Sequence, residues 1–210
     1  MDTDAKPFPA TLSVEYNPKS DRLTAFFRLF MTVPIWIVLA FLMGYHGGST
    51  GNGSNASVAY GAGFTFLPAL LMIVFRRKYP KWWYDWNLAL MKFYMRVSAY
   101  FLLLRDEYPS TDQEQAVRLD FPYPDAAKDL NRWMPLVKWL LAVPHYVCLF
   151  GLGVAAVVFT MVAWFAILFT GTYPKSLFDI VEGAMRWSLR VSAYAFLLVT
   201  DRYPPFSLKE

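Results

Sequence analysis

The sequence predicts an all-α membrane protein made of two tandem, parallel repeats, and three observations support this prediction. Of the 210 residues, 56% are hydrophobic and only 17% are charged, which is too apolar for an ordinary soluble domain of this length. Two long stretches contain no Asp, Glu, Lys or Arg. Finally, the motif Tyr79-Pro80-Lys81 recurs as Tyr173-Pro174-Lys175, 94 residues later (173 − 79).

The internal repeat extends well beyond this motif. The run Arg-Val-Ser-Ala-Tyr at 96–100 returns at 190–194 with the same spacing of 94 (190 − 96). Earlier in the chain, Arg22 and Arg28 are answered by Arg132 and Lys138 with a spacing of 110 (132 − 22). The boundaries that follow are a tail at 1–10, repeat 1 at 11–109, a linker at 110–115, repeat 2 at 116–206 and a tail at 207–210.

Each repeat opens with a short strand. Apolar and polar residues alternate from Thr11 to Tyr16, before Asn17-Pro18, and again from Ala116 to Phe121. Alternation of this kind is typical of a strand with one buried face, and Asn-Pro ends it. We expect both strands on the cytoplasmic side, where they can pair.

A transmembrane hairpin follows the first strand. Residues 29–75 contain no charged residue over 47 positions (75 − 29 + 1), enough for two spans of roughly 20 residues each. The segment 47–57 contains only Gly, Ser, Thr, Asn and Ala, a composition typical of a flexible linker. The predicted spans are therefore 25–44 and 58–75, with Pro34 and Pro68 as internal kinks.

The second repeat has a shorter hairpin. Residues 139–174 are free of charge over 36 positions (174 − 139 + 1). One straight helix of this length would reach about 54 Å, beyond a hydrocarbon core of about 30 Å. We therefore expect spans at 134–151 and 153–170, with the turn at Gly151-Leu152-Gly153. The first hairpin is 16 residues longer (110 − 94), and the linker at 47–57 accounts for most of this difference.

The charges at the hairpin ends predict the orientation. Arg76, Arg77, Lys78 and other cations flank the hairpins, whereas the two tips carry no formal charge. The positive-inside rule therefore places both termini on the cytoplasmic side of a bacterial inner membrane. Residues 1–10 contain no apolar signal segment, so the first span would direct insertion. An even number of crossings in each repeat makes the repeats parallel.

Each repeat ends in an amphipathic helix, at 82–104 and at 176–199. Each helix carries a narrow charged stripe beside a wide aromatic and aliphatic face. The candidate residues for binding a lipid headgroup or a partner are Lys92, Arg96, Arg186 and Arg190, with Asp85 and Asp179.

Three interpretations of this stripe stay open. In the first, each helix lies at the membrane interface and its cations reach lipid phosphates. In the second, the stripe holds the cytoplasmic layer together, through Glu182 with Arg186 and through Asp106 or Asp201 with nearby arginines. In the third, the two stripes face each other in a basic groove for a lipid headgroup or an acidic partner.

Sequence motifs for chemistry are absent. The chain lacks the phosphate-binding, dinucleotide-binding and zinc motifs, and the single Cys148 allows no disulfide within the chain. His145 lies within a predicted span, where it could bind haem or chlorophyll. Its counterpart in the first repeat is Ile35 (145 − 110), which favours a packing role. We expect no enzyme activity, no cofactor and no metal.

Motifs in the second repeat resemble those of a known family. They are Thr-Gly-Thr-Tyr-Pro at 170–174, Arg186-Trp187 with the 190–194 run, and Asp-Arg-Tyr-Pro-Pro-Phe at 201–206. Together they resemble a bacterial membrane-protein family known only as a domain of unknown function, in which the module occurs singly or doubled. The likeness is weaker over the first repeat, where Arg76-Arg77-Lys78 replaces part of the motif. The resemblance implies an architecture and a bacterial inner-membrane setting, and no activity.

These observations predict a non-enzymatic accessory or scaffold subunit of a membrane protein assembly. Its expected partners are anionic membrane lipids and other membrane proteins or a second copy of the chain. Nucleic acid is not expected, because the cations lie beside apolar runs. The alternative is a small transport, channel or lipid-handling protein, although neither hairpin places an ionisable side chain such as Asp or Glu within the membrane, where an ion path would need one.

Overall fold

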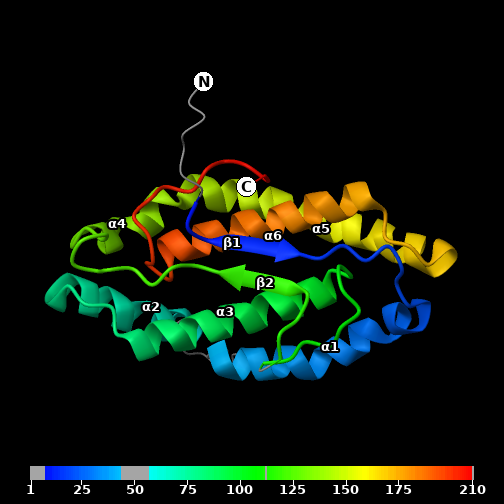
Figure 1. The fold of residues 1–210 in the computed structure, drawn as a ribbon, viewed down its shortest axis with the longest axis horizontal. Helices are drawn as coiled ribbons and strands as arrows, with labels where there is room; N and C mark the ends of the chain where they lie inside the picture. Colours follow the sequence, from blue (N-terminus) through cyan, green and yellow to red (C-terminus); the bar gives the residue numbers. More distant parts are fainter. Residues whose placement is uncertain (1–7, 44–56, 112, 210) are drawn as a thin grey trace, which may run out of the picture.

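The computed structural model describes residues 8–43, 57–111 and 113–209. Most of the predicted linker at 47–57 and of the N-terminal tail at 1–10 lies outside these residues. The elements in chain order are β1 (Thr11–Val14), α1 (Arg22–Met43), α2 (Ser57–Arg76), α3 (Lys81–Phe101), β2 (Val117–Asp120), α4 (Met134–Leu141), α5 (Val143–Thr170) and α6 (Lys175–Ala195) (Figure 1).

The two predicted strands are confirmed, and they form a small antiparallel sheet. Leu12 pairs with Leu119 and Val14 with Val117, and all four of these side chains are buried. The residues between them point to the exposed face. The alternation in sequence therefore sets the register, because a shift by one residue would expose the apolar side chains.

Each strand packs on a helix from the other half of the chain. In Figure 1, β1 runs along α6 and β2 along α3, and these pairs are in contact. The Tyr16 hydroxyl donates to the Tyr173 carbonyl at 2.7 Å, and the Tyr123 hydroxyl donates to the Tyr79 carbonyl. The two halves therefore complete each other's packing.

The remaining helices form an outer layer. Helix α1 contacts α2, α3 and α5, while α4 contacts α2, α5 and α6. Helices α3 and α6 lie between this outer layer and the sheet, so α6 buries twelve of its 21 residues. The amphipathic helices predicted at 82–104 and 176–199 thus form, and they make up an inner layer of the fold.

The predicted second hairpin is wrong. Gly151 and Gly153 lie inside one continuous helix, α5, of 28 residues. The helix break in this apolar stretch lies at Ala142, between α4 and α5. Pro144 occupies the first turn of α5, where a missing N–H costs nothing and the fixed φ favours a helix start. The backbone stays helical through both glycines, so neither of them forms a turn.

The prediction of two tandem, parallel transmembrane hairpins is therefore wrong. Among the described residues, α5 is the one helix long and apolar enough to cross a membrane. Helices α1 and α2 do form, with Pro34 and Pro68 inside them as expected. Neither qualifies as a span over the part of the chain that is described, so the multi-pass topology with cytoplasmic termini is not supported either.

The sheet register can be tested by cross-linking. In a Cys148→Ser background, Ser13→Cys with Arg118→Cys should form a disulfide, because these positions are paired and both lie on the exposed face. The link would be identified by mass spectrometry of proteolytic peptides. Ser13→Cys with Asp120→Cys is the control, since this diagonal pair is about 7–8 Å apart. Equal cross-linking of both pairs would contradict the register.

Candidate functional site

The arginines predicted on α6 bind backbone within the chain. Arg190 is buried, and its Nη1 and Nη2 donate to the carbonyls of Ser207 (3.2 Å) and Lys209 (2.7 Å). Arg186 donates through Nε to the Leu12 carbonyl at 3.0 Å and through Nη1 to the Leu208 carbonyl at 3.2 Å. These two side chains fasten both the C-terminal segment and β1 to α6.

The pairing of Glu182 with Arg186 is confirmed. Arg186 Nη2 lies 2.8 Å from Glu182 Oε1, and both side chains are largely buried. The same carboxylate oxygen accepts the Val14 N–H at 3.0 Å. Glu182 therefore links the helix to β1 as well as to the guanidinium.

The matching residues on α3 divide between internal and exposed positions. Arg96 Nη1 donates to the Ser110 carbonyl at 2.7 Å, so it too holds the segment that follows its own helix. Lys92 is partly exposed, and no bond of its side chain is found among the described residues. The arginines of both stripes are therefore engaged by backbone carbonyls of the chain, as the second interpretation expects, while Lys92 is not.

Asp85 and Asp179 form exposed ion pairs with the lysine four residues earlier. The distances are 2.9 Å from Lys81 Nζ to Asp85 and 2.7 Å from Lys175 Nζ to Asp179. The hydrogen bond to Asp179 is the main cause that raises the pKa of Lys175, and the Asp179 and Glu182 charges add to it. Exposed pairs of this kind stabilise a fold only slightly.

An ion pair between a buried cation and a partly buried carboxylate lies at the start of each half, and the predicted pairing of Asp106 with a nearby arginine is confirmed. Arg28 is 2% exposed and pairs with Asp106; it also donates to the Tyr100 carbonyl and lies over the Tyr100 ring at 4.6 Å. Asp106 accepts the Asp21 N–H at 3.1 Å. The carboxylate therefore joins the end of α3 to the start of α1.

The second half repeats this arrangement. Lys138 is fully buried, with Nζ 2.6 Å from Asp201 and 2.7 Å from the Thr200 carbonyl. It lies 5.3 Å from the Tyr194 ring centre, and Asp201 accepts the Asn131 N–H. The sequence analysis found Arg28 and Lys138 at equivalent positions of the repeat, 110 residues apart, but interpreted them only as charges flanking the hairpins.

Burial shifts the pKa values of several ionisable groups in the interior of the fold. The pKa of Lys138 is lowered by desolvation, against the opposing effects of the hydrogen bond and charge of Asp201. Burial also raises the pKa of Tyr84 and of Tyr173, each to about 12. A buried ion pair that is not fully compensated contributes more to a unique arrangement than to net stability.

His145 occupies an aromatic enclosure made by the 201–206 motif. Its side chain is fully buried and stacks on the Phe206 ring with 3.9 Å between centroids, and the Tyr203 ring lies at 4.8 Å. Its Nδ1 accepts the indole N–H of Trp187 at 3.1 Å. A neutral imidazole with an accepting Nδ1 carries its proton on Nε2, so in this state neither nitrogen offers a lone pair to haem iron.

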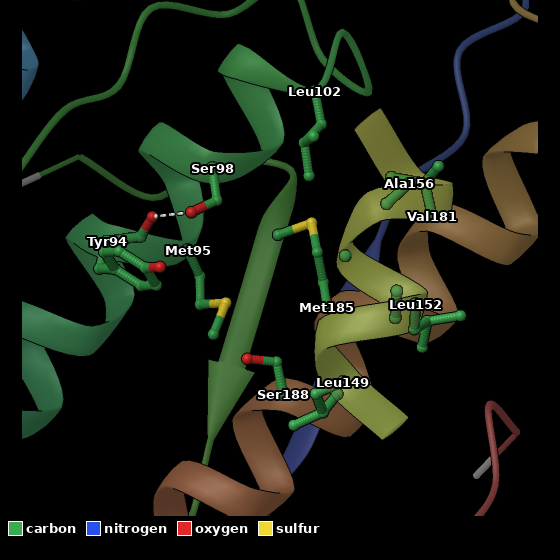
Figure 2. Close-up of a pocket in the computed structure, with 12 residues that line it drawn as sticks. Tyr94, Met95, Ser98, Leu102, Leu149, Leu152, Ala156, Val181, Met185 and Ser188 are labelled. Carbon is green, nitrogen blue, oxygen red and sulfur yellow. Dashed lines mark hydrogen bonds between the residues drawn. The ribbon is translucent and has the colours of Figure 1, made fainter. Parts of the chain in front are cut away.

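An apolar pocket of about 240 Å³ lies between α3, α5 and α6. Figure 2 shows Met95 from α3 and Met185 from α6 projecting into the space between the helices. The hydroxyl groups of Ser98 and Ser188 belong to the lining, and Ser98 donates to the Tyr94 carbonyl at 2.9 Å. Methionine adapts to irregular apolar ligands. No group of three or more metal-binding side chains is found among the described residues.

The comparisons with known proteins bear on the second half of the chain. A DUF4389 domain, a domain of unknown function, is found at residues 132–207. The matched region contains α4, α5 and α6, the Lys138–Asp201 pair and the enclosure of His145. This confirms the predicted resemblance to a family of unknown function. No curated protein and no solved structure matches the chain.

The buried pairs can be tested by removing one charge. Asp201→Asn leaves the fully buried Lys138 beside a neutral amide, and we expect it to lower the free energy of unfolding by about 3–5 kcal/mol. Asp106→Asn should have a comparable effect through Arg28. The measurement is urea unfolding of the detergent-solubilised chain, followed by circular dichroism.

Asp85→Asn is the matched control for these variants. It removes the exposed pair with Lys81 and should cost no more than about 0.5 kcal/mol. A loss for Asp201→Asn as small as that of the control would show that the buried pair does not support the fold.

Proposed function

We propose that this protein is a non-enzymatic accessory or scaffold subunit of a bacterial inner-membrane assembly, and that the outer face of α5 and α1 holds it in the bilayer. The observation that carries the proposal is the exposure of α5. Only 17% of its most apolar 18-residue window is buried within the fold. A core helix of a soluble protein would be mostly buried, so this helix needs an apolar environment from outside the chain.

The exposed face of α5 is uniformly apolar. Phe150 is 77% exposed, and Val147, Val154, Met161 and Phe169 are also exposed at helical spacings. They share one stripe along the helix because residues three or four apart lie on the same face. This stripe is suited to contact with acyl chains or with the apolar helix of a partner.

The opposite face of α5 is built differently. Ala156 and Ala163 are buried there, and small residues allow helices to approach closely. His145 lies on the same side, within its aromatic enclosure. Helix α5 therefore has one face for the fold and one for its surroundings.

Helix α1 extends the apolar face. The indole N–H of Trp164 donates to the Ala25 carbonyl at 3.1 Å, and the Trp164 ring stacks on Phe26. Phe26 and Phe30 are exposed beside it. A contiguous apolar surface formed by two helices marks a membrane or protein interaction site.

The polar side chains support a scaffold role. Arg96, Arg186 and Arg190 donate hydrogen bonds to carbonyls of the chain itself, so the proposal assigns them to internal support.

We also propose that the two halves are a duplicated module, because residues related by the spacings of 94 and 110 make corresponding contacts. The proposed partners are anionic lipids and another membrane protein or a second copy of the chain.

Membrane association is tested by extraction. In bacterial membranes carrying the tagged full chain, the protein should resist sodium carbonate at high pH and be released by detergent. Replacing Val147 and Val154 with lysine places charges on the outer face of α5 and should reduce the membrane-bound fraction severalfold. Release of the unmodified chain by carbonate would contradict the proposal.

The scaffold role is tested by gentle purification of the same chain and mass spectrometry of what accompanies it. We expect a membrane protein in fixed stoichiometry. A chain that purifies alone as a monomer would overturn the scaffold role and leave lipid handling as the function.

The pocket between α3, α5 and α6 favours lipid handling as the second candidate. Its lining of methionine, leucine and alanine suits an acyl chain, and its volume of about 240 Å³ is slightly below the range of about 300–1,000 Å³ for small-molecule sites. A segment of one acyl chain would therefore fit the pocket better than a bulky ligand.

Two glycines of α5 provide a matched test of this candidate. Gly153 lines the pocket and Gly151 does not, and a Cβ at either position would meet nothing within 4 Å. Gly153→Leu should fill the pocket and lower the affinity for a fluorescent fatty acid about tenfold, whereas Gly151→Leu should leave it unchanged. Equal binding by the two variants would exclude the pocket as the site.

A further inference from the structure

We propose that the Arg76–Lys78 cluster, formed by Arg76, Arg77 and Lys78 at the carboxyl end of α2, binds the phosphate of an anionic lipid headgroup. The inference rests on the proposed membrane association and adds a ligand class and a site to it. The site is distinct from the arginines of α3 and α6, which bind backbone inside the chain.

The cluster is open to a ligand. All three side chains are exposed, and within the described residues none of them makes a hydrogen bond or an ion pair. Phe75, just before the cluster, is 71% exposed and Trp82, just after it, is 70% exposed. Large aromatic side chains beside cations are typical of the level of the membrane headgroups, where the rings contact acyl chains and the cations contact phosphate.

The backbone at the centre of the cluster carries an unfavourable residue. Arg77 has a φ of 50°, in the left-handed region that side chains with a Cβ avoid. The residue 94 positions later (171 − 77) is Gly171, with a φ of 75°. The turn after α2 therefore has an arginine where the turn after α5 has a glycine, which adopts this φ without strain. Backbone strain of this kind is concentrated at functional sites.

The turn itself does not need positive charge. In the second half, Thr170-Gly171-Thr172 forms the corresponding end of α5, and the Thr170 hydroxyl satisfies the Ala166 carbonyl at 2.7 Å. Cations at the end of a helix do interact favourably with its dipole, but three consecutive cations exceed what the dipole requires. We infer that the extra charge serves an anionic partner.

Arg132 strengthens the positive charge at this position. Its Nε donates to the Val74 carbonyl at 2.6 Å, two residues before the cluster. A fourth cation, from the other half of the chain, therefore lies at the end of α2. Several cations near one headgroup add their attraction for phosphate.

The test exchanges the turn of one half for that of the other. The variant Arg76→Thr, Arg77→Gly, Lys78→Thr has the sequence that the fold already accommodates at 170–172. The control variant changes Lys19, Lys128 and Lys209 to glutamine, which removes an equal number of positive charges from other exposed positions. Both are purified as full chains in detergent and titrated with short-chain phosphatidylglycerol, phosphatidylcholine or inorganic phosphate, with thermal unfolding as the readout.

We expect the unmodified chain to prefer phosphatidylglycerol over phosphatidylcholine. The exchanged turn should lose about tenfold to a hundredfold in affinity for phosphatidylglycerol, and the control should keep it. Arg77→Gly alone should weaken binding and raise the melting temperature, because glycine relieves the left-handed φ. That combination separates binding from folding.

Three results would overturn the proposal: unchanged affinity in the exchanged variant, an equal loss in the control, or inorganic phosphate binding as well as the lipid does. A chain that stays in membranes during carbonate extraction but shows no preference for phosphatidylglycerol refutes only the headgroup site. A chain that carbonate releases refutes the proposed function as well.

Discussion

The fold depends on a buried cation paired with a partly buried carboxylate at the start of each half. Asp106 and Asp201 each accept a backbone N–H just before an outer helix and pair with a cation of that helix, Arg28 or Lys138. Each carboxylate therefore connects the segment after the inner helix to the beginning of the outer one. Without it, a buried positive charge would face an aromatic ring and a carbonyl alone, which is costly in an apolar interior.

These pairs explain why the apolar outer helices hold a defined position. Apolar side chains that face lipid do not favour one helix arrangement over another, because lipid tails are as apolar as the side chains of a neighbouring helix. Directional bonds are needed to specify the arrangement. The arginines of α3 and α6 add to this, because their bonds to Ser110, Ser207 and Lys209 fix the segments that carry the two carboxylates.

The sequence predicted what is local and missed what depends on backbone partners. The period-two alternation at 11–16 and 116–121 identified both strands, and the repeated motif located α3 and α6, because these signals lie within a few residues of one another. Gly151 and Gly153 suggested a turn, but an isolated glycine is also tolerated inside a helix. The acceptors of Arg96 and Arg190 are carbonyls, which every residue has, so no side-chain pattern could reveal them. The pocket likewise arises only from the assembly of three helices.

The exchange of strands between the halves has a consequence for biosynthesis. Val14 and Tyr16 bond to Glu182 and Tyr173, which are 168 and 157 residues away along the chain. The first strand leaves the ribosome early, whereas β2, with which it pairs, and α6, on which it packs, are made much later. The contact order of this interface is therefore high, and its closure should be a late and slow step of folding. Meanwhile the apolar helices would stand exposed in water, so early transfer to a bilayer would protect the nascent chain from aggregation.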